Sequence, residues 1–188
     1  MSRVIQQHPL ETMNDMNERF TVRLRKAVHV FCAGHFITLT DDLCEAVHGH
    51  NWLVGADVEG QPDPHGMVID FIRLRDLLTQ IVLRLDHRML LPTQNRLLSV
   101  STAAGPTRDG VAGPAEVTVR FQNRRWVFPA DECLLLPIEN TTAEWLARWI
   151  GRELLDAMAA AGSPITGRLT IEVDECLGQS AVWEVTPQ

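Results

Sequence analysis

The sequence predicts an α+β domain in which two helices lie on one face of an antiparallel four-stranded sheet. Apolar and polar residues alternate in two segments near the N-terminus and in two near the C-terminus, and apolar residues recur at helical spacing in two longer segments between them. The expected order is strand, strand, helix, insertion, helix, strand, strand, which is typical of an α+β layer. The chain has 188 residues and is 45% hydrophobic, which suits one domain with a sizeable core.

The four strands are predicted from alternation. Apolar side chains alternate with polar ones from Phe20 and continue towards His35, which predicts one long strand. Residues 48–59 predict a second strand, and the two are expected to pair as an antiparallel hairpin. Residues 169–173 and 181–185 predict the last two strands.

The two helices are predicted from spacing and from capping residues. Residues 71–85 carry apolar side chains at helical spacing, and Asp70 is a suitable N-cap. The second helix is expected to begin at Thr141, because Thr141 as N-cap and Glu144 at the third position fit a capping box. The Gly-Ser-Pro sequence at residues 162–164 ends it.

Two segments fall outside this pattern. Residues 1–18 are polar with little periodic apolar content, and we expect a flexible N-terminal extension before a single domain of residues 19–188. Residues 93–136 form an insertion between the helices. Within it, residues 99–113 are rich in small and polar residues and predict a loop, whereas 116–121 and 126–128 predict a hairpin.

Composition excludes several classes of function. The formal net charge of −7 argues against a general electrostatic grip on nucleic acid or on an anionic membrane. The four cysteines form no Cys-x-x-Cys pair and are too few for a disulfide scaffold, which favours a reducing, cytoplasmic setting. No apolar run is long enough to span a bilayer, and residues 1–18 contain no signal core. We therefore expect a soluble cytoplasmic protein that binds neither nucleic acid nor membrane.

Three histidines and a thiol lie within sixteen residues, from His35 to His50. His48 and His50 are two apart on a predicted strand, so their side chains leave the same face. With His35 from a neighbouring strand they would offer three nitrogen ligands and leave one position open, which is typical of a catalytic zinc site. Cys44 is either a fourth ligand or a base whose thiolate the nearby cation favours. The alternative is an exposed strand face that binds no metal.

Three further residues have two interpretations each. His87 follows the first helix, where the helix dipole favours an imidazolium and Asp86 would pair with it. The functional alternative is a carboxylate that orients an imidazole for proton transfer. Glu175 ends a predicted strand among apolar neighbours, either as a solvated strand-end acid or as part of a site.

Six motifs resemble, in order, those of the 6-pyruvoyltetrahydropterin synthase and 6-carboxytetrahydropterin synthase family. They are Phe31-x-Ala33-x-His35, Cys44-x-x-x-His48-Gly49-His50-Asn51, Ile69-Asp70-Phe71, Leu85-Asp86-His87, Glu139-Asn140-x-Thr142-x-Glu144 and Val173-x-Glu175. The resemblance extends from about residue 20 to residue 184, apart from the insertion, and six motifs in sequence are specific.

The resemblance implies the tunnelling fold, whose domains assemble into a barrel-like oligomer, typically a hexamer, with active sites at subunit interfaces. It implies that His35, His48 and His50 are zinc ligands and that Cys44 is the proton-abstracting base. It further implies a role for each of four other residues: Asp86 and His87 as a proton relay, Glu175 as the anchor of the guanidine-like edge of a pterin and a member of that relay, and Thr142 as a further pterin contact.

The spacing of one motif indicates the reaction type. Three residues separate Cys44 from His48, which resembles the bacterial carboxy-forming enzymes. The resemblance thus implies conversion of 7,8-dihydroneopterin triphosphate to 6-carboxytetrahydropterin, acetaldehyde and triphosphate, a step in deazaguanine (queuosine-type) biosynthesis. The alternatives are the pyruvoyl-forming elimination of triphosphate and a non-catalytic zinc-containing protein that binds a pterin or purine.

Two features depart from the family pattern. Asp41-Asp42-Leu43 precedes Cys44, where the family often has a basic residue that would help to hold a triphosphate. The insertion could cap the pocket, extend the oligomer or supply replacement phosphate ligands. The candidate arginines in it are Arg108, Arg120, Arg124 and Arg125.

Overall fold

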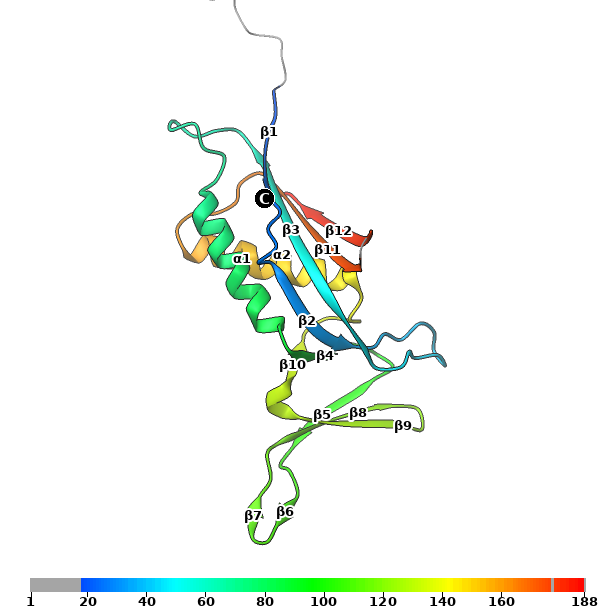
Figure 1. Cartoon of the computed structure of the whole chain (residues 1–188). Coiled ribbons are helices and arrows are strands. Elements are labelled where there is room, and N and C mark those ends of the chain that lie inside the picture. Colours follow the sequence, from blue (N-terminus) through cyan, green and yellow to red (C-terminus); the bar gives the residue numbers. More distant parts are fainter. Residues whose placement is uncertain (1–17, 177, 188) are drawn as a thin grey trace, which may run out of the picture.

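The structure is a computed structural model that describes residues 18–176 and 178–187. The predicted N-terminal extension therefore lies outside the described residues except for Glu18. Figure 1 shows an elongated molecule in which a curved sheet packs against two helices and a smaller β-structure extends from one end.

The main sheet has seven strands, in the order β10-β4-β2-β3-β11-β12, with β1 also paired to β3. Their bounds are β1 Phe20–Leu24, β2 Val30–His35, β3 His48–Gly60, β4 Arg88–Pro92, β10 Cys133–Leu136, β11 Arg168–Cys176 and β12 Gln179–Val185. The prediction of four antiparallel strands is wrong in number and in direction, because β4 pairs in parallel with both β2 and β10. Both added strands are short apolar runs, which show no alternation, so their sequence did not reveal them.

The predicted long strand from Phe20 to His35 is two strands, β1 and β2, which pair with successive parts of β3. Between them the chain turns, and the amide of His29 donates to Lys26 O at 3.0 Å. The turn changes which side chains face the core, since Leu24 and Phe31 are buried whereas Val28 is 61% exposed. An unbroken strand would point Val28 inward with Leu24 and expose Phe31.

Helix α1 spans Phe71–Leu85 and begins as predicted, because Asp70 Oδ1 accepts from the amides of Ile72 and Arg73 at 2.9 and 3.1 Å. Helix α2 spans Ala143–Ala160, with Thr142 rather than Thr141 at its N-cap position. The predicted capping box is wrong. Thr141 is fully buried, and its hydroxyl donates to Phe36 O at 2.9 Å instead of capping the helix.

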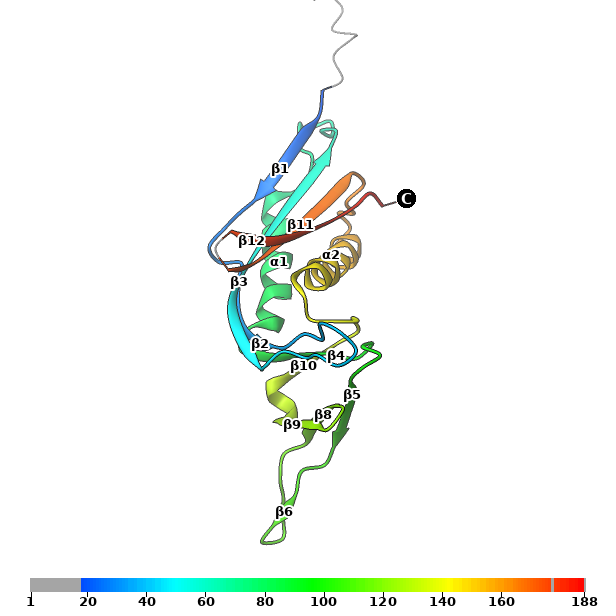
Figure 2. The ribbon, with the colours of Figure 1, turned by 90° about the vertical axis from the view of Figure 1, so that its right-hand side faces the viewer.

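Both helices cover the same face of the curved sheet, as predicted (Figure 2). The register pairs residues of β3 with residues of β11 that point to this face, for example Val54 with Val173 and Ala56 with Ile171. These side chains and the apolar stripes of the two helices form one continuous core. No helix in the described part of the chain is long and apolar enough to cross a membrane.

The insertion builds its own three-stranded sheet, in the order β5-β8-β9, with a small β6-β7 hairpin beyond it. The bounds are β5 Ser99–Ala103, β6 Thr107–Arg108, β7 Val111–Ala112, β8 Glu116–Phe121 and β9 Arg124–Pro129, followed by the 3₁₀ turn Ala130–Glu132. The predicted hairpin is confirmed, and the predicted loop over 99–113 is wrong. Most of β5 is exposed, so its sequence has no apolar period to reveal it.

A second apolar cluster joins the insertion to the end of the main sheet. Val117, Val119 and Phe121 of β8 pack there with Phe36 and Cys44. The insertion is therefore attached directly beside the segment between β2 and β3 that leads to His48.

Candidate metal and active site

The three histidines come together because β2 and β3 are neighbours in the sheet. His35 is the last residue of β2 and pairs with His48, the first residue of β3, while His50 pairs with Ala33. His48, His50 and Trp52 alternate along β3 on the face that continues into the helix-covered core. Both the predicted face and the predicted neighbouring strand are therefore found.

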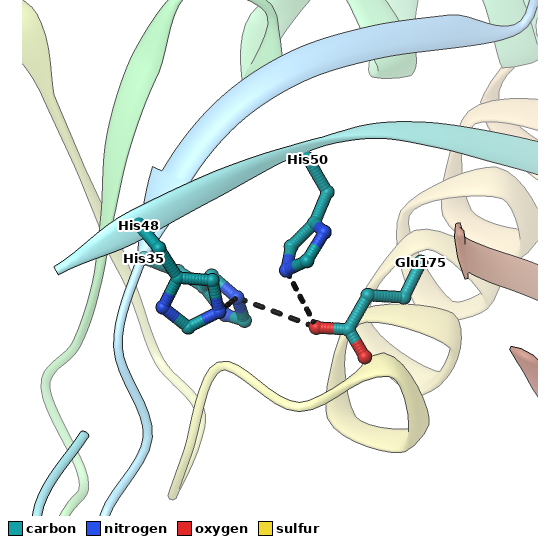
Figure 3. Close-up of side chains that lie close together, drawn as sticks. All are labelled: His35, His48, His50 and Glu175. Carbon is teal, nitrogen blue, oxygen red and sulfur yellow. Dashed lines mark hydrogen bonds and ion pairs between the residues drawn. The ribbon is translucent and has the colours of Figure 1, made fainter. Parts of the chain in front are cut away.

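Four side chains converge at this point, as Figure 3 shows. The Nε2 atoms of His35 and His48 are 3.1 Å apart, and Glu175 Oε1 lies 3.1 Å from His50 Nε2 and 3.4 Å from His35 Nε2. One ligand atom from each of the four residues lies within 4.8 Å of all the others. Such a group could hold a metal ion.

Hydrogen bonds on the far side of two rings fix which nitrogens face the group. His35 Nδ1 lies 2.8 Å from Thr141 O and His48 Nδ1 lies 2.9 Å from Ala46 O. A carbonyl oxygen only accepts, so each Nδ1 carries a proton, and a ring without a second proton presents an Nε2 lone pair. Two lone pairs at 3.1 Å repel each other, whereas a cation between them would bind both. Metal-binding histidines are commonly oriented in this way by a carbonyl.

The remaining contacts fit a cation as well. His50 Nε2 is buried, and within the described part of the chain no hydrogen bond satisfies it despite the nearby carboxylate. Burial lowers the pKa of His35, and the hydrogen bond to Thr141 opposes that shift only in part. A neutral imidazole is the form that binds metal. The donor set of three imidazoles and one carboxylate suits zinc and also other divalent ions.

Glu175 stands at the end of β11 and lines a hollow of about 320 Å³ beside the histidines. Thr142 and His35 line the same hollow, so the predicted pterin contacts lie next to the predicted metal ligands. Sequence reasoning did not find that Glu175 is also a possible metal ligand. No spacing signal could have found it, because β11 reaches the site only through pairing with β3.

Cys44 is placed apart from this group. Its side chain is 5% exposed and packs in the second apolar cluster with Phe36 and Met89. Burial raises the pKa of the Cys44 thiol, and the nearby Arg124 guanidinium acts in the opposite direction. Its sulfur is not among the four converging ligand atoms, so the alternative of Cys44 as a fourth ligand gains no support.

Asp86 and His87 form the predicted pair, with His87 Nδ1 2.9 Å from Asp86 Oδ2. The amide of Cys32 donates to Asp86 Oδ1 at 2.8 Å, and this bond, followed by that to His87, lowers the pKa of Asp86. The His87 side chain is 82% exposed, and its backbone has a positive φ of 56°. A positive φ is uncommon outside glycine and is often found at functional sites.

Within one chain, the Asp86–His87 pair lies apart from the group of His35, His48 and His50. His87 lines a hollow with Cys32, Gly34 and Gly49. Along β2, Cys32 and Gly34 alternate with Ala33 and His35, so they face the opposite side of the sheet. The structure therefore separates the predicted proton relay from the predicted metal site by the thickness of the sheet.

The fold and the site together define an α+β protein with a candidate metal centre of three imidazoles and one carboxylate, placed where two neighbouring strands end and begin. The chain belongs to the 6-pyruvoyl tetrahydropterin synthase family, whose family model matches residues 24–184.

Two relatives carry a more particular name. The chain is 28% identical over 128 residues to a protein of Pyrococcus horikoshii, covering 67% of this chain and 69% of the relative. It is 25% identical over 154 residues to a protein of Methanocaldococcus jannaschii, covering 81% and 88%. Both relatives are provisionally named 6-carboxy-5,6,7,8-tetrahydropterin synthase.

Solved structures of the family share the fold. The 6-pyruvoyl tetrahydropterin synthase of Plasmodium falciparum superposes with a TM-score of 0.79 at 24% identity, covering 91% of this chain and all of that one. Two structures of the Plasmodium vivax protein, each with a TM-score of 0.77 at 20% identity and the same coverage, are described as mutants of a catalytic residue, a glutamate replaced by alanine or by cysteine.

Proposed function

We propose that this protein is a zinc-dependent lyase that converts 7,8-dihydroneopterin triphosphate to 6-carboxytetrahydropterin, acetaldehyde and triphosphate in deazaguanine (queuosine-type) biosynthesis. The observation that carries the proposal is the pair of Nε2 atoms 3.1 Å apart in rings whose Nδ1 atoms are both held by carbonyls. Family membership supports a pterin substrate, and the names of the two relatives support the carboxy-forming reaction.

His35, His48 and His50 would hold the zinc, which when bound supplies a Lewis acid for the oxygens of the substrate side chain. Glu175 and Thr142 would bind the pterin in the adjoining hollow. A carboxylate accepts two parallel hydrogen bonds from a guanidine-like edge, which orients the ring as well as holding it. Glu175 Oε1 already faces the histidines, so a ring held there would carry its side chain towards them.

Two residues are candidates for the group that takes the proton from the substrate. Cys44 is the candidate that the family motif implies, but its thiol is buried and its pKa is raised. Glu45 is the second candidate, because its carboxylate is 4.0 Å from His48 Nε2 and 30% exposed. The catalytic glutamate of the Plasmodium vivax protein favours including it. If Cys44 is the base, Cys44→Ala abolishes turnover with zinc retained, while Glu45→Gln keeps most of it; the reverse result assigns the role to Glu45.

Asp86 and His87 would return a proton to the substrate, with the carboxylate holding the imidazole in position. Because the pair faces the other side of the sheet, we propose that the pair of one subunit works with the histidine group of another. This arrangement requires a homo-oligomer, for which the family resemblance implies a hexamer.

Metal removal tests this proposal. Protein stripped with a chelator should lose turnover of 7,8-dihydroneopterin triphosphate, and zinc added back should restore it in proportion to the zinc bound. Full turnover by the stripped protein would contradict it. The products distinguish the two alternative functions. The pyruvoyl-forming reaction releases triphosphate without acetaldehyde, and a non-catalytic protein binds the pterin and forms no product.

A further inference from the structure

The segment between β2 and β3 forms a closed loop, residues 38–45, which ends at the two candidate proton acceptors. The amide of Leu39 donates to Leu43 O at 2.8 Å, and the amide of Glu45 donates to Ile37 O at 3.0 Å. These bonds close the loop on itself and bring the chain back beside β2 before it enters β3. Within the loop, the amide of Thr40 also donates to Leu43 O, and the amides of Asp42 and Leu43 donate to Thr40 Oγ1, but none of these further bonds involves Cys44 or Glu45.

Polar side chains of the insertion add hydrogen bonds and an ion pair to this loop. Asn95 Nδ2 donates to Thr38 Oγ1 at 3.0 Å. Arg96 pairs with the Asp41 carboxylate at 2.7 Å, and Gln122 Nε2 donates to Asp41 O at 3.2 Å. The entry to the insertion and the β8–β9 turn thus both reach the first half of the loop.

Arg124, the first residue of β9, reaches the other half. One terminal nitrogen donates to Cys44 O at 2.7 Å and the other donates to Glu45 O at 3.3 Å. The planar guanidinium fork matches two acceptors at once, which a flexible ammonium does less well. Arg124 therefore holds the backbone of both candidate proton acceptors.

The guanidinium is itself held by aromatic rings. It lies 4.6 Å from the centroid of the Trp126 ring, and Trp126 stacks on Phe36 at 4.7 Å. Phe36 follows His35 directly in the chain. A continuous path of contacts thus runs from the metal group through the rings to Arg124 and back to the loop.

These contacts argue against the expectation that Arg124 binds phosphate. Both of its terminal nitrogens already donate to carbonyl oxygens, and its face covers a ring. The side chain of its neighbour Arg125 points the other way from the strand, is exposed, and forms no hydrogen bond or ion pair with the described residues. The two adjacent arginines form a matched pair for comparison.

We propose that Arg124 is a positioning residue: from the insertion, it fixes the backbone of Cys44 and Glu45 and keeps the loop closed beside the metal group. Its effect on the reaction rests on the proposed function, in which one of these two residues takes the proton. Its effect on the loop does not, and can be measured without substrate.

The first test measures how open the loop is. Zinc-loaded protein is treated with iodoacetamide, and the alkylation rates of Cys44 and of the exposed Cys32 are followed by mass spectrometry. Because the Arg124 charge also lowers the pKa of the Cys44 thiol, the rates are compared per thiolate, from their pH dependence. On that basis, loss of two hydrogen bonds should make Arg124→Gln alkylate about tenfold faster at Cys44 while Cys32 keeps its rate. Arg124→Lys should fall between, and Arg125→Gln should match the unchanged protein. An unchanged Cys44 rate, or equal acceleration of both thiols, would overturn the proposal.

The second test measures turnover of 7,8-dihydroneopterin triphosphate. Arg124→Gln should lower kcat by about tenfold with little change in KM or in zinc content, and Arg124→Lys should recover part of the loss. A loss of kcat explained by missing zinc, or unchanged kcat in Arg124→Gln, would count against a positioning role. If the unchanged protein fails to turn over this substrate, the proposed function fails, and the alkylation rates still decide the role of Arg124.

Discussion

His35 illustrates how a single side chain is prepared for its role. Its ring is 1% exposed and donates through Nδ1 to Thr141 O, a residue that is far away in sequence. The Nε2 lone pair therefore has one direction, towards His48, His50 and Glu175. The sequence predicted the three imidazoles from their types and spacing, but not the carbonyl that orients His35, because that contact forms only when α2 docks.

Glu175 has two possible roles that one substitution separates. If it binds the pterin, Glu175→Gln should keep zinc and weaken pterin binding by about 10- to 100-fold, because a charge-assisted hydrogen-bond pair is lost. Isothermal titration with a pterin, together with metal analysis, checks both. Glu172→Gln, on the same strand but outside both the hollow and the metal group, serves as the control and should change neither. Loss of zinc in Glu175→Gln would make Glu175 a metal ligand instead.

His29 makes the stability of the fold depend on pH. It is fully buried, its Nε2 lies 3.2 Å from Thr79 Oγ1, and that hydroxyl donates to Arg75 O. Burial, with smaller contributions from the nearby Lys26 and Arg75 charges, lowers the pKa of His29 below its ordinary 6.5. The unfolded chain then binds the proton more readily, so this contribution is complete above about pH 6.5 and is lost as the pH falls below it.

Denaturant unfolding at about pH 8 and about pH 5 measures this loss. The unchanged protein should lose more stability between the two pH values than His29→Gln, which has no titrating ring. Equal losses in the two proteins would show that His29 does not carry the effect.

At the scale of the elements, the sequence predicted the bounds of a helix or strand correctly where one periodic pattern of apolar residues covers the whole element. Helix α1 was predicted with its bounds and its N-cap, because amphipathic spacing and Asp70 both belong to a local segment. The β1–β2 break, by contrast, depends on a turn that changes the alternation by one residue, and β4 and β10 have no alternation at all. The positions of these strands in the sheet depend on the strands with which they pair, and the local sequence does not specify those partners.

The start of α2 gives a prediction at this scale. Thr141→Val should cost about 1–3 kcal/mol in the free energy of unfolding, because Phe36 O would stay buried without its donor. Thr142→Ala should cost less than about 0.5 kcal/mol, since the Thr142 side chain makes no capping hydrogen bond. Chemical denaturation of the two variants decides this, and a larger loss in Thr142→Ala than in Thr141→Val would contradict it and indicate a capping hydrogen bond from Thr142.

At the scale of the whole molecule, the two halves of the predicted catalytic machinery face opposite sides of one sheet. The sequence predicted which residues form each half, from the motifs around His48 and around His87. It could not place the halves relative to each other, because their separation depends on the alternation of Cys32 and His35 along β2.

Subunit complementation tests whether two copies complete one site. His48→Ala and His87→Ala should each be inactive as a homo-oligomer. Mixed oligomers, co-expressed with two different tags and purified through both, should recover part of the activity, because some interfaces then combine an intact histidine group with an intact Asp86–His87 pair. Mixed oligomers as inactive as the single variants would place both halves in one subunit.

The most direct test of the account is the identity of the product. Zinc-loaded protein is incubated with 7,8-dihydroneopterin triphosphate, the pterins are identified by mass spectrometry, and acetaldehyde is assayed in parallel. The account predicts 6-carboxytetrahydropterin and an equal amount of acetaldehyde, both absent after zinc is removed. Unchanged substrate from protein that holds its zinc would contradict a lyase function on this substrate, and 6-pyruvoyltetrahydropterin without acetaldehyde would contradict the carboxy-forming reaction.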